Sequence, residues 1–276
     1  MNSKSNYFLK GAGLGLRRLF LNEFLQTPQS DVDFFEIAPE NWITIGGKFG
    51  KQFRAMTEQH KFVCHGLSLS LGSTDPLDEA FVLQIKNFMQ QHGIEHYSEH
   101  LSYCSHNGHL YDLMPIPFTQ EAVKHVATRI KRVQEILERK IAIENVSYYT
   151  FLGAEMTEID FFNAVVNEAD CDVLLDVNNI YVNSVNHHYD ALEFLNAMPV
   201  ERITYAHIAG HYKEADDFLV DTHGAPIIAP VWKLLQHAYQ RFGVFPTLLE
   251  RDFNLPSISE LVAEVKQIKK FQTEAK

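Results

Sequence analysis

The chain has 276 residues, of which 46% are hydrophobic, and it carries a formal net charge of −11. This length allows a large core, so one domain over residues 1–276 is expected, while the acidic balance argues against a nucleic-acid partner. No apolar run approaches the roughly 18 residues that span a membrane, and three scattered cysteines suit a reducing compartment, so we expect a soluble, cytoplasmic protein without a membrane partner.

Short apolar segments alternate with longer segments of helical period along the chain, which is the pattern of repeated βα units. The predicted strands are residues 11–16, 33–37, 62–67, 95–101, 140–146, 172–177, 202–208 and 246–251. Between them, Asp75-Pro76 predicts the start of a helix, Thr119 precedes a second, and Ser257 with Glu260 forms a capping-box pattern before a third. Eight such units in a chain of this length predict an α/β fold, a single TIM (β/α)8 barrel.

Polar side chains stand at the carboxyl end of nearly every predicted strand, where catalytic groups of such barrels lie. They are Glu36, His65, Glu99, His100, Glu144, Asn145, Asp176, Asn178, Asn179, His207 and Glu250, with His211, Asp221 and His223 in the loop after the seventh strand. Polar groups that follow buried apolar strands are costly unless they meet one another, water or an ion. A metal site at the C-terminal ends of the strands is therefore predicted.

Each of these residues taken alone has a simpler explanation, because a single histidine is more often a satisfied core residue and a single carboxylate is more often paired with arginine. Together, with few lysines or arginines nearby, they favour cations as the counter-charge. The candidate ligands are His65, His100, Glu144, Asp176, Asn179, His207, Asp221, His223 and Glu250. This set is too large for one ion, so two or three are expected, and imidazole with carboxylate but no thiolate suits iron, zinc or manganese.

Several motifs resemble those of the DUF692 (UPF0276) family of multinuclear non-haem iron-dependent oxidative enzymes, which includes the methanobactin biosynthesis oxidase. The motifs are FFEIAPENW at 34–42, HGLSLS at 65–70, SEHLS at 98–102, ENVS at 144–147, LDVNN at 175–179, HIAGH at 207–211 and DTHG at 221–224. They are specific and cover almost the whole chain. The resemblance therefore supports the same TIM-barrel fold as the strand pattern.

The resemblance implies an oxidoreductase with two or three iron ions of mixed valence that uses molecular oxygen to modify cysteines of a ribosomally made precursor peptide. A separate leader-presenting partner protein is also implied. One ion would be held by His65, His100 and Glu144, a second by Glu144, Asp176, His207 and Glu250, and a third by Asn179, Asp221 and His223. Glu144 and Asp176 would take part in catalysis, and His211 would lie at the rim as a further ligand or proton carrier.

Two other functions remain open at this stage. The ligand order also resembles endonuclease IV and xylose isomerase barrels, which would make the protein a zinc- or manganese-dependent hydrolase or isomerase. In the endonuclease-like pattern the residue three after the sixth-strand Asp is His, whereas this chain has Asn179. A non-catalytic metal-binding module is the third possibility.

Overall fold

In a computed structural model, which describes residues 9–27, 30–150 and 152–275, eight parallel strands close into a barrel. The barrel strands are β1 (Ala12–Gly15), β2 (Phe34–Ile37), β3 (Lys61–Gly66), β4 (Tyr97–His100), β7 (Ala142–Glu144), β8 (Asp172–Asp176), β9 (Ile203–Ile208) and β12 (Thr247–Leu249). Their order around the barrel is β1-β12-β9-β8-β7-β4-β3-β2. The TIM-barrel prediction is confirmed, and each predicted strand overlaps one of these strands; only β3 begins outside its predicted range, one residue earlier.

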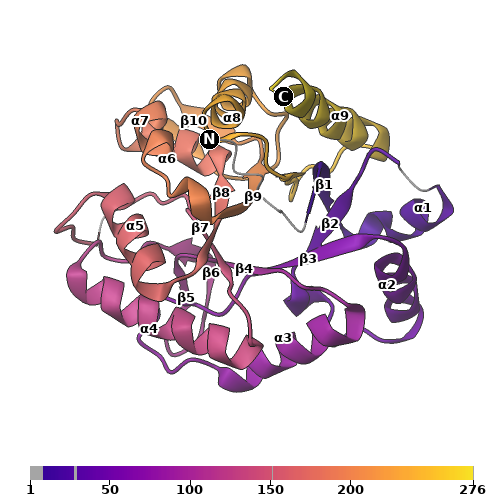
Figure 1. Cartoon of the computed structure of the whole chain (residues 1–276), viewed down its shortest axis with the longest axis horizontal. Coiled ribbons are helices and arrows are strands. Elements are labelled where there is room, and N and C mark those ends of the chain that lie inside the picture. The colour runs from indigo at the N-terminus through magenta and orange to yellow at the C-terminus, as the bar shows by residue number, and fades with distance from the viewer. Residues whose placement is uncertain (1–8, 28–29, 151, 276) are drawn as a thin grey trace.

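An outer ring of helices surrounds the barrel (Figure 1). Its members are α1 (Leu21–Gln26), α2 (Gly47–Gln59), α3 (Glu79–His92), α4 (Gln120–Leu137), α5 (Glu158–Ala169), α6 (Val177–Asn186), α7 (Ala191–Asn196), α8 (Ala229–Phe242) and α9 (Ile258–Glu274). Thr119 caps α4, and the capping box of Ser257 and Glu260 opens α9, as predicted. Within the described ranges, no helix combines the length and apolar character that a membrane span requires.

One helix start was predicted wrongly. Helix α3 begins at Glu79, where the side chain of Asp78 accepts a hydrogen bond from the backbone N–H of Phe81. Asp75 instead accepts a hydrogen bond from the backbone N–H of Asn107, in the loop after β4. The Asp-Pro pair thus anchors a neighbouring loop rather than the helix.

Two hairpins on the barrel were not predicted. Strands β5 (Tyr103–Ser105) and β6 (His109–Met114) pair antiparallel after β4, and β10 (Tyr212–Ala215) and β11 (Phe218–Val220) pair after β9. Their strands are short, and β6 and β10 are largely exposed, so they carry no apolar alternation that would mark them in the sequence.

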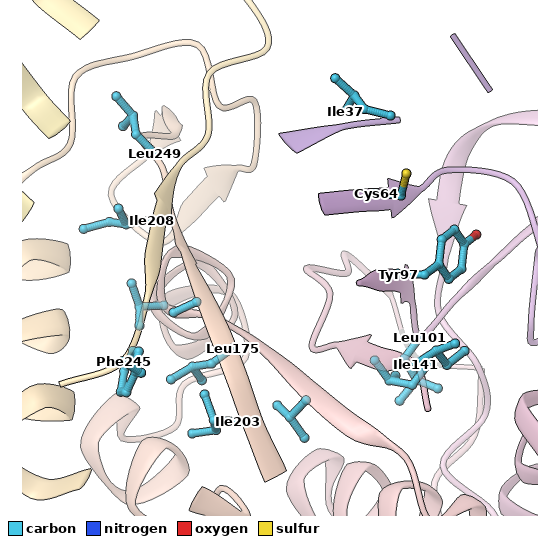
Figure 2. Packing of buried hydrophobic residues seen from close by; sticks show 14 of the residues in the cluster. Ile37, Cys64, Tyr97, Leu101, Ile141, Leu175, Ile203, Ile208, Phe245 and Leu249 are labelled. Carbon is cyan, nitrogen blue, oxygen red and sulfur yellow. The ribbon is translucent and has the colours of Figure 1, made fainter. Parts of the chain in front are cut away.

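The apolar core has two parts, separated by the wall of the barrel. The larger part lies between the strands and the helices, and Figure 2 shows some of its members, including Cys64, Leu175, Ile208 and Leu249. The smaller part fills the barrel itself with Leu9, Phe34, Val63, Ala142, Leu174, Tyr205 and Leu248. Strand β1 contributes Gly13 beside it, where a Cβ atom would come within 2.5 Å of the Phe34 ring. The barrel is therefore a packed core and not a pore.

Candidate metal centre

The interior of the barrel changes from apolar to polar toward the carboxyl ends of its strands. Side chains alternate across a strand, so the residue two positions after an inward-facing one points inward again. The apolar residues that fill the barrel from six of the strands are Phe34, Val63, Ala142, Leu174, Tyr205 and Leu248. The residues two positions further along these strands are, in the same order, Glu36, His65, Glu144, Asp176, His207 and Glu250. None of these six is more than 8% exposed. The period of two thus gathers buried ionisable groups above the apolar filling.

His65, His100 and Glu144 form a first group. Glu144 Oε2 lies 3.1 Å from His65 Nε2 and 3.3 Å from His100 Nε2. The strand register brings them together, since His65 pairs with Ser98 and His100 pairs with Glu144. His100 Nδ1 lies 2.9 Å from the carbonyl oxygen of Gly66, to which its N–H can donate. That bond leaves the Nε2 lone pair of His100 free for an ion.

Glu144, Asp176, His207 and Glu250 form a second group, with one ligand atom from each lying within 4.8 Å of the others. His207 Nδ1 is 2.9 Å from Glu250 Oε2, 3.7 Å from Glu144 Oε1 and 3.9 Å from Asp176 Oδ2. Glu144 thus offers Oε2 to the first group and Oε1 to the second. A carboxylate in this position can bridge two ions.

The third group differs from the set that the family resemblance implied. It contains His223, Glu250 and Asp252, with His223 Nδ1 3.2 Å from Asp252 Oδ2 and 3.4 Å from Glu250 Oε2. Asp221 Oδ1 lies 2.8 Å from the other ring nitrogen of His223. The Asn179 amide nitrogen lies 3.3 Å from Glu144 Oε1, beside the bridging carboxylate. Of the three residues expected to hold a third ion, only His223 belongs to this group.

Buried atoms without a hydrogen-bond partner among the described residues test whether metal ions fit here. Six of them belong to candidate ligands: Glu144 Oε2, Asp176 Oδ2, Asn179 Oδ1, His207 Nδ1, His223 Nε2 and Glu250 Oε2. The contacts of these atoms are to other candidate ligands, such as 2.8 Å between His223 Nε2 and Asp221 Oδ1 and 2.9 Å between His207 Nδ1 and Glu250 Oε2. The donor atoms therefore face one another around positions that an ion could occupy. All are nitrogen or oxygen donors, and this donor set fits iron, zinc or manganese.

The protonation of the groups also favours cations. Burial alone would lower the pKa of His100, but the charge of Glu144 raises it to about 9. Burial raises the pKa of Asp176 to about 8, and the nearby charge of Glu144 adds to the effect. Without ions, the groups therefore hold extra protons at neutral pH. Ion binding must release these protons, so affinity should rise with pH.

His211 does not lie at an exposed rim as expected. It is 6% exposed, and its Nδ1 lies 2.7 Å from Asn178 Oδ1. The amide nitrogen of Asn178 in turn donates to Asp221 Oδ1 over 2.8 Å. Burial lowers the pKa of His211, which favours its neutral form. The imidazole is therefore connected to Asp221 through Asn178, and it is outside all three groups.

A cavity of about 750 Å³ leads to the three groups. His100, Glu144, His223 and Glu250 line it, and so do residues 109–113 of the β5–β6 hairpin. A second cavity of about 220 Å³ reaches His65 from the side of Arg17 and shares Glu250 and Asp252 with the first. The groups are thus buried but accessible from one face of the barrel.

Arg17 and Asp252 are site residues that the sequence interpretation did not single out as ligands or counter-charges. The Arg17 guanidinium contacts the Asp252 carboxylate, and its Nε donates to the carbonyl oxygen of Arg251 over 3.0 Å. The sequence does contain a signal for Arg17, because it lies two residues after Gly15, at the carboxyl end of β1, where the other site residues of the barrel also lie. Arg17 is therefore a cation at the mouth of the centre.

The loop that follows Glu144 is held by a half-buried acid, Glu158. Glu158 accepts hydrogen bonds from the Tyr148 hydroxyl and from the Asn183 amide, both over 3.1 Å. Asn183 also bonds the backbone of Val146 and Tyr148. Burial raises the pKa of Glu158 to about 7, above the usual 4.5. Its stabilising effect is therefore complete below about pH 4.5 and is lost as the pH rises through 7.

Glu158→Gln should remove this pH dependence, because glutamine mimics the protonated acid and cannot ionise. Between pH 5 and 8 we expect the free energy of unfolding of the unsubstituted protein to fall by about 2 kcal/mol relative to the variant, after allowance for partial exposure. Urea unfolding at both pH values measures the difference. The exposed Glu193→Gln variant is the control, and parallel pH profiles for Glu158→Gln and the unsubstituted protein would contradict the assignment.

Comparison with known proteins identifies close relatives over nearly the full chain. The profile of the family described as "RiPP precursor modification enzyme MbnB/TglH/ChrH" matches residues 11–273, where RiPP denotes a ribosomally synthesised and post-translationally modified peptide. A UPF0276 protein of Shewanella loihica is 65% identical over 263 residues, covering 95% of both chains. A UPF0276 protein of Pseudomonas aeruginosa is 55% identical over 265 residues, covering 96% of this chain and 93% of the relative.

Solved structures share the architecture at low sequence identity. A xylose isomerase-like TIM barrel protein of Mycobacterium smegmatis in complex with magnesium has a TM-score of 0.65 at 11% identity, covering 100% of this chain and 99% of its own. Endonuclease IV of Thermus thermophilus has a TM-score of 0.60 at 16% identity, and the match covers 97% of this chain and 100% of the endonuclease chain. These likenesses establish the fold alone. The family profile and the close relatives together show that the chain belongs to the MbnB/TglH/ChrH family of RiPP precursor modification enzymes, the UPF0276 proteins.

Proposed function

We propose that this protein is an iron-dependent oxidative enzyme that uses molecular oxygen to modify cysteine residues of a precursor peptide. The observation that carries the proposal is the convergence of buried histidine and carboxylate donor atoms in three groups, six of which make no hydrogen bond to the described residues. Membership of a family described by precursor modification favours a peptide substrate. The three groups offer nitrogen and oxygen ligands without thiolate, a donor set that is compatible with iron.

Each candidate ligand has a distinct role in this proposal. His65, His100 and Glu144 would hold one ion, and Glu144, Asp176, His207 and Glu250 a second. His223, Glu250 and Asp252 would hold a third, with Asp221 and Asn179 orienting His223 and Glu144. Bound iron would supply one-electron redox chemistry and the activation of oxygen.

The chain's own residues would hold the substrate and its proton. A cysteine side chain entering the larger cavity would reach the Asp221 carboxylate, which lies 2.8 Å from His223 Nε2 and could accept the thiol proton. His211 would keep Asp221 in place through Asn178. Delivery of the peptide by a separate leader-presenting protein remains a prediction.

Exposed apolar side chains at the mouth of the cavity support a peptide substrate. Leu67, Tyr111 and Phe253 all line the cavity, and they are 41%, 101% and 65% exposed. Exposed large apolar residues around an opening are typical of a binding surface. The mouth can therefore hold residues that flank the modified cysteine, while the polar floor holds the cysteine itself.

Phe253→Ala should raise the KM for the peptide about tenfold with little change in kcat, because an aromatic contact at the centre of an interface contributes more than about 1 kcal/mol. Steady-state oxygen uptake over a range of peptide concentrations separates the two constants. Phe49→Ala, which removes an exposed phenylalanine of α2 away from this cavity, is the matched control. Equal KM values for Phe253→Ala and the control would exclude the mouth as the peptide site.

Elemental analysis after anaerobic preparation tests the choice of metal. We expect two or three iron ions per chain and conversion of a cysteine peptide only after ferrous loading. Protein that retains zinc alone, and stays inert toward the peptide after ferrous loading, would contradict the proposal. The likeness to endonuclease IV and to sugar epimerases, at 11–16% identity, shows fold only and supports no second function.

A further inference from the structure

A continuous chain of buried hydrogen bonds runs beneath the first two groups and joins the far sides of two imidazole rings. His65 Nδ1 lies 2.8 Å from Ser98 Oγ, and Ser98 Oγ lies 2.8 Å from the Tyr205 hydroxyl. The Tyr205 hydroxyl lies 2.7 Å from Glu36 Oε2, which is also 3.0 Å from His207 Nε2. None of the five residues is more than 5% exposed, so no bulk water competes for these bonds.

The contacts indicate where the protons of this chain lie, since the Ser98 hydroxyl is 2.8 Å from Tyr205 but 3.4 Å from its other acceptor, the Cys64 carbonyl oxygen. The Nε2 atom of His65 faces Glu144 and the Nδ1 atom of His207 faces Glu250, so with ions bound the opposite nitrogens carry the hydrogens. His65 Nδ1–H then donates to Ser98, and His207 Nε2–H donates to Glu36. Tyr205 donates to Glu36, so it accepts from Ser98.

We propose that Ser98, Tyr205 and Glu36 form a relay that couples the two metal groups through His65 and His207. All hydrogen bonds of the relay are donated in the direction of the Glu36 carboxylate. Its negative charge makes both imidazoles stronger metal ligands. The effect on His207 is direct, and the effect on His65 passes through the hydroxyls of Tyr205 and Ser98. The same bonds fix opposite ring nitrogens as ligand atoms in the two histidines. These three are positioning residues. The inference rests on the proposed function only in that metal ions occupy both groups.

The relay has a sequence explanation in the strand alternation. Tyr205 and His207 are two apart on β9, and Ser98 and His100 are two apart on β4, so each pair faces the barrel interior. Tyr205 belongs to the apolar filling of the barrel, yet its hydroxyl reaches the polar layer above. A phenylalanine would fill the same space without joining the two groups, so Tyr205→Phe tests the relay with little change in packing.

The test uses Co²⁺ as the probe, so that it does not depend on iron or oxygen. Titration of the unsubstituted protein should show at least two Co²⁺ ions, assigned to the groups by comparison with His100→Ala and Asp176→Asn proteins. Tyr205→Phe should weaken only the first group, about tenfold, while Glu36→Gln should weaken both about tenfold or more. In proton NMR of the Co²⁺ protein, Tyr205→Phe should shift the exchangeable N–H signal of His65 and leave that of His207 unchanged.

Controls separate the relay from folding and from the proposed function. Tyr239→Phe removes another buried tyrosine hydroxyl, bonded to Thr247, and should leave Co²⁺ binding unchanged. Ser98→Ala cuts the relay at a second link and should reproduce the Tyr205→Phe result. Unchanged first-group affinity and unchanged N–H signals in both variants would overturn the relay. Protein that binds Co²⁺ as predicted but does not oxidise a cysteine peptide would contradict the proposed function and leave the relay supported.

Discussion

Glu144→Gln is expected to reduce metal binding by more than about 100-fold and to abolish turnover, because one carboxylate serves two groups. Substituting an outer partner of a metal ligand typically costs about 10–100-fold in affinity, and Glu144 is itself a candidate ligand. Its Oε2 lies 3.1 Å from His65 Nε2 and 3.3 Å from His100 Nε2, and its Oε1 lies 3.7 Å from His207 Nδ1. Glutamine keeps the volume but replaces a charged oxygen with an amide that carries hydrogens.

Metal analysis after dialysis against a limited excess of iron measures this effect. The variant should lose at least one ion per chain relative to the unsubstituted protein. Glu158→Gln is the matched control, since it neutralises a half-buried acid in the segment after the same strand and Glu158 belongs to none of the three groups. Full metal content in Glu144→Gln would show that Glu144 does not bridge two ions.

Removal of the metal ions should lower the melting temperature by about 10 °C. At a free ion concentration about 1,000 times the dissociation constant, one bound ion stabilises the folded state by about 4 kcal/mol, and each kcal/mol shifts the midpoint by about 2–4 °C in a domain approaching this size. The buried carboxylates of Glu144, Asp176 and Glu250 are the physical reason, because they lose their counter-charge with the ions.

Thermal unfolding with a chelator and with added iron measures this shift. Glu144→Gln protein should respond less than the unsubstituted protein, and the peripheral Glu193→Gln variant should respond equally. Identical melting temperatures with and without chelator would mean that ions do not stabilise the fold. This result would contradict the binding of metal ions by the three groups.

The sequence predicts the barrel well because its strands are short apolar runs between helices of clear period. It also predicts which side chains meet, since the carboxyl ends of parallel strands converge. Residues such as Glu144 and His207 therefore come together with partners distant in the sequence. The ligand roles themselves remain predictions, because convergence of donor atoms does not identify the ion.

The features that the sequence did not predict depend on contacts between distant segments. Asp252 lies in the third group because of how the loop after β12 turns, and Asn179 lies beside Glu144 because α6 begins directly after β8; periodicity describes neither. The relay through Tyr205 was missed since a tyrosine in an apolar strand resembles a core residue. The hairpin β5–β6, which forms a wall of the larger cavity, has no apolar pattern at all.

Oxygen uptake under single-turnover conditions tests the proposed function most directly. Protein loaded anaerobically with ferrous iron is mixed with a cysteine-containing precursor peptide and exposed to a known amount of oxygen. We expect oxygen consumption that requires the peptide, disappears when its cysteines are replaced by serine, and accompanies a mass change confined to the cysteine residues. Iron-loaded protein that consumes oxygen at the same rate with the serine peptide, and leaves the cysteine peptide unchanged, would contradict a cysteine-directed oxidative enzyme.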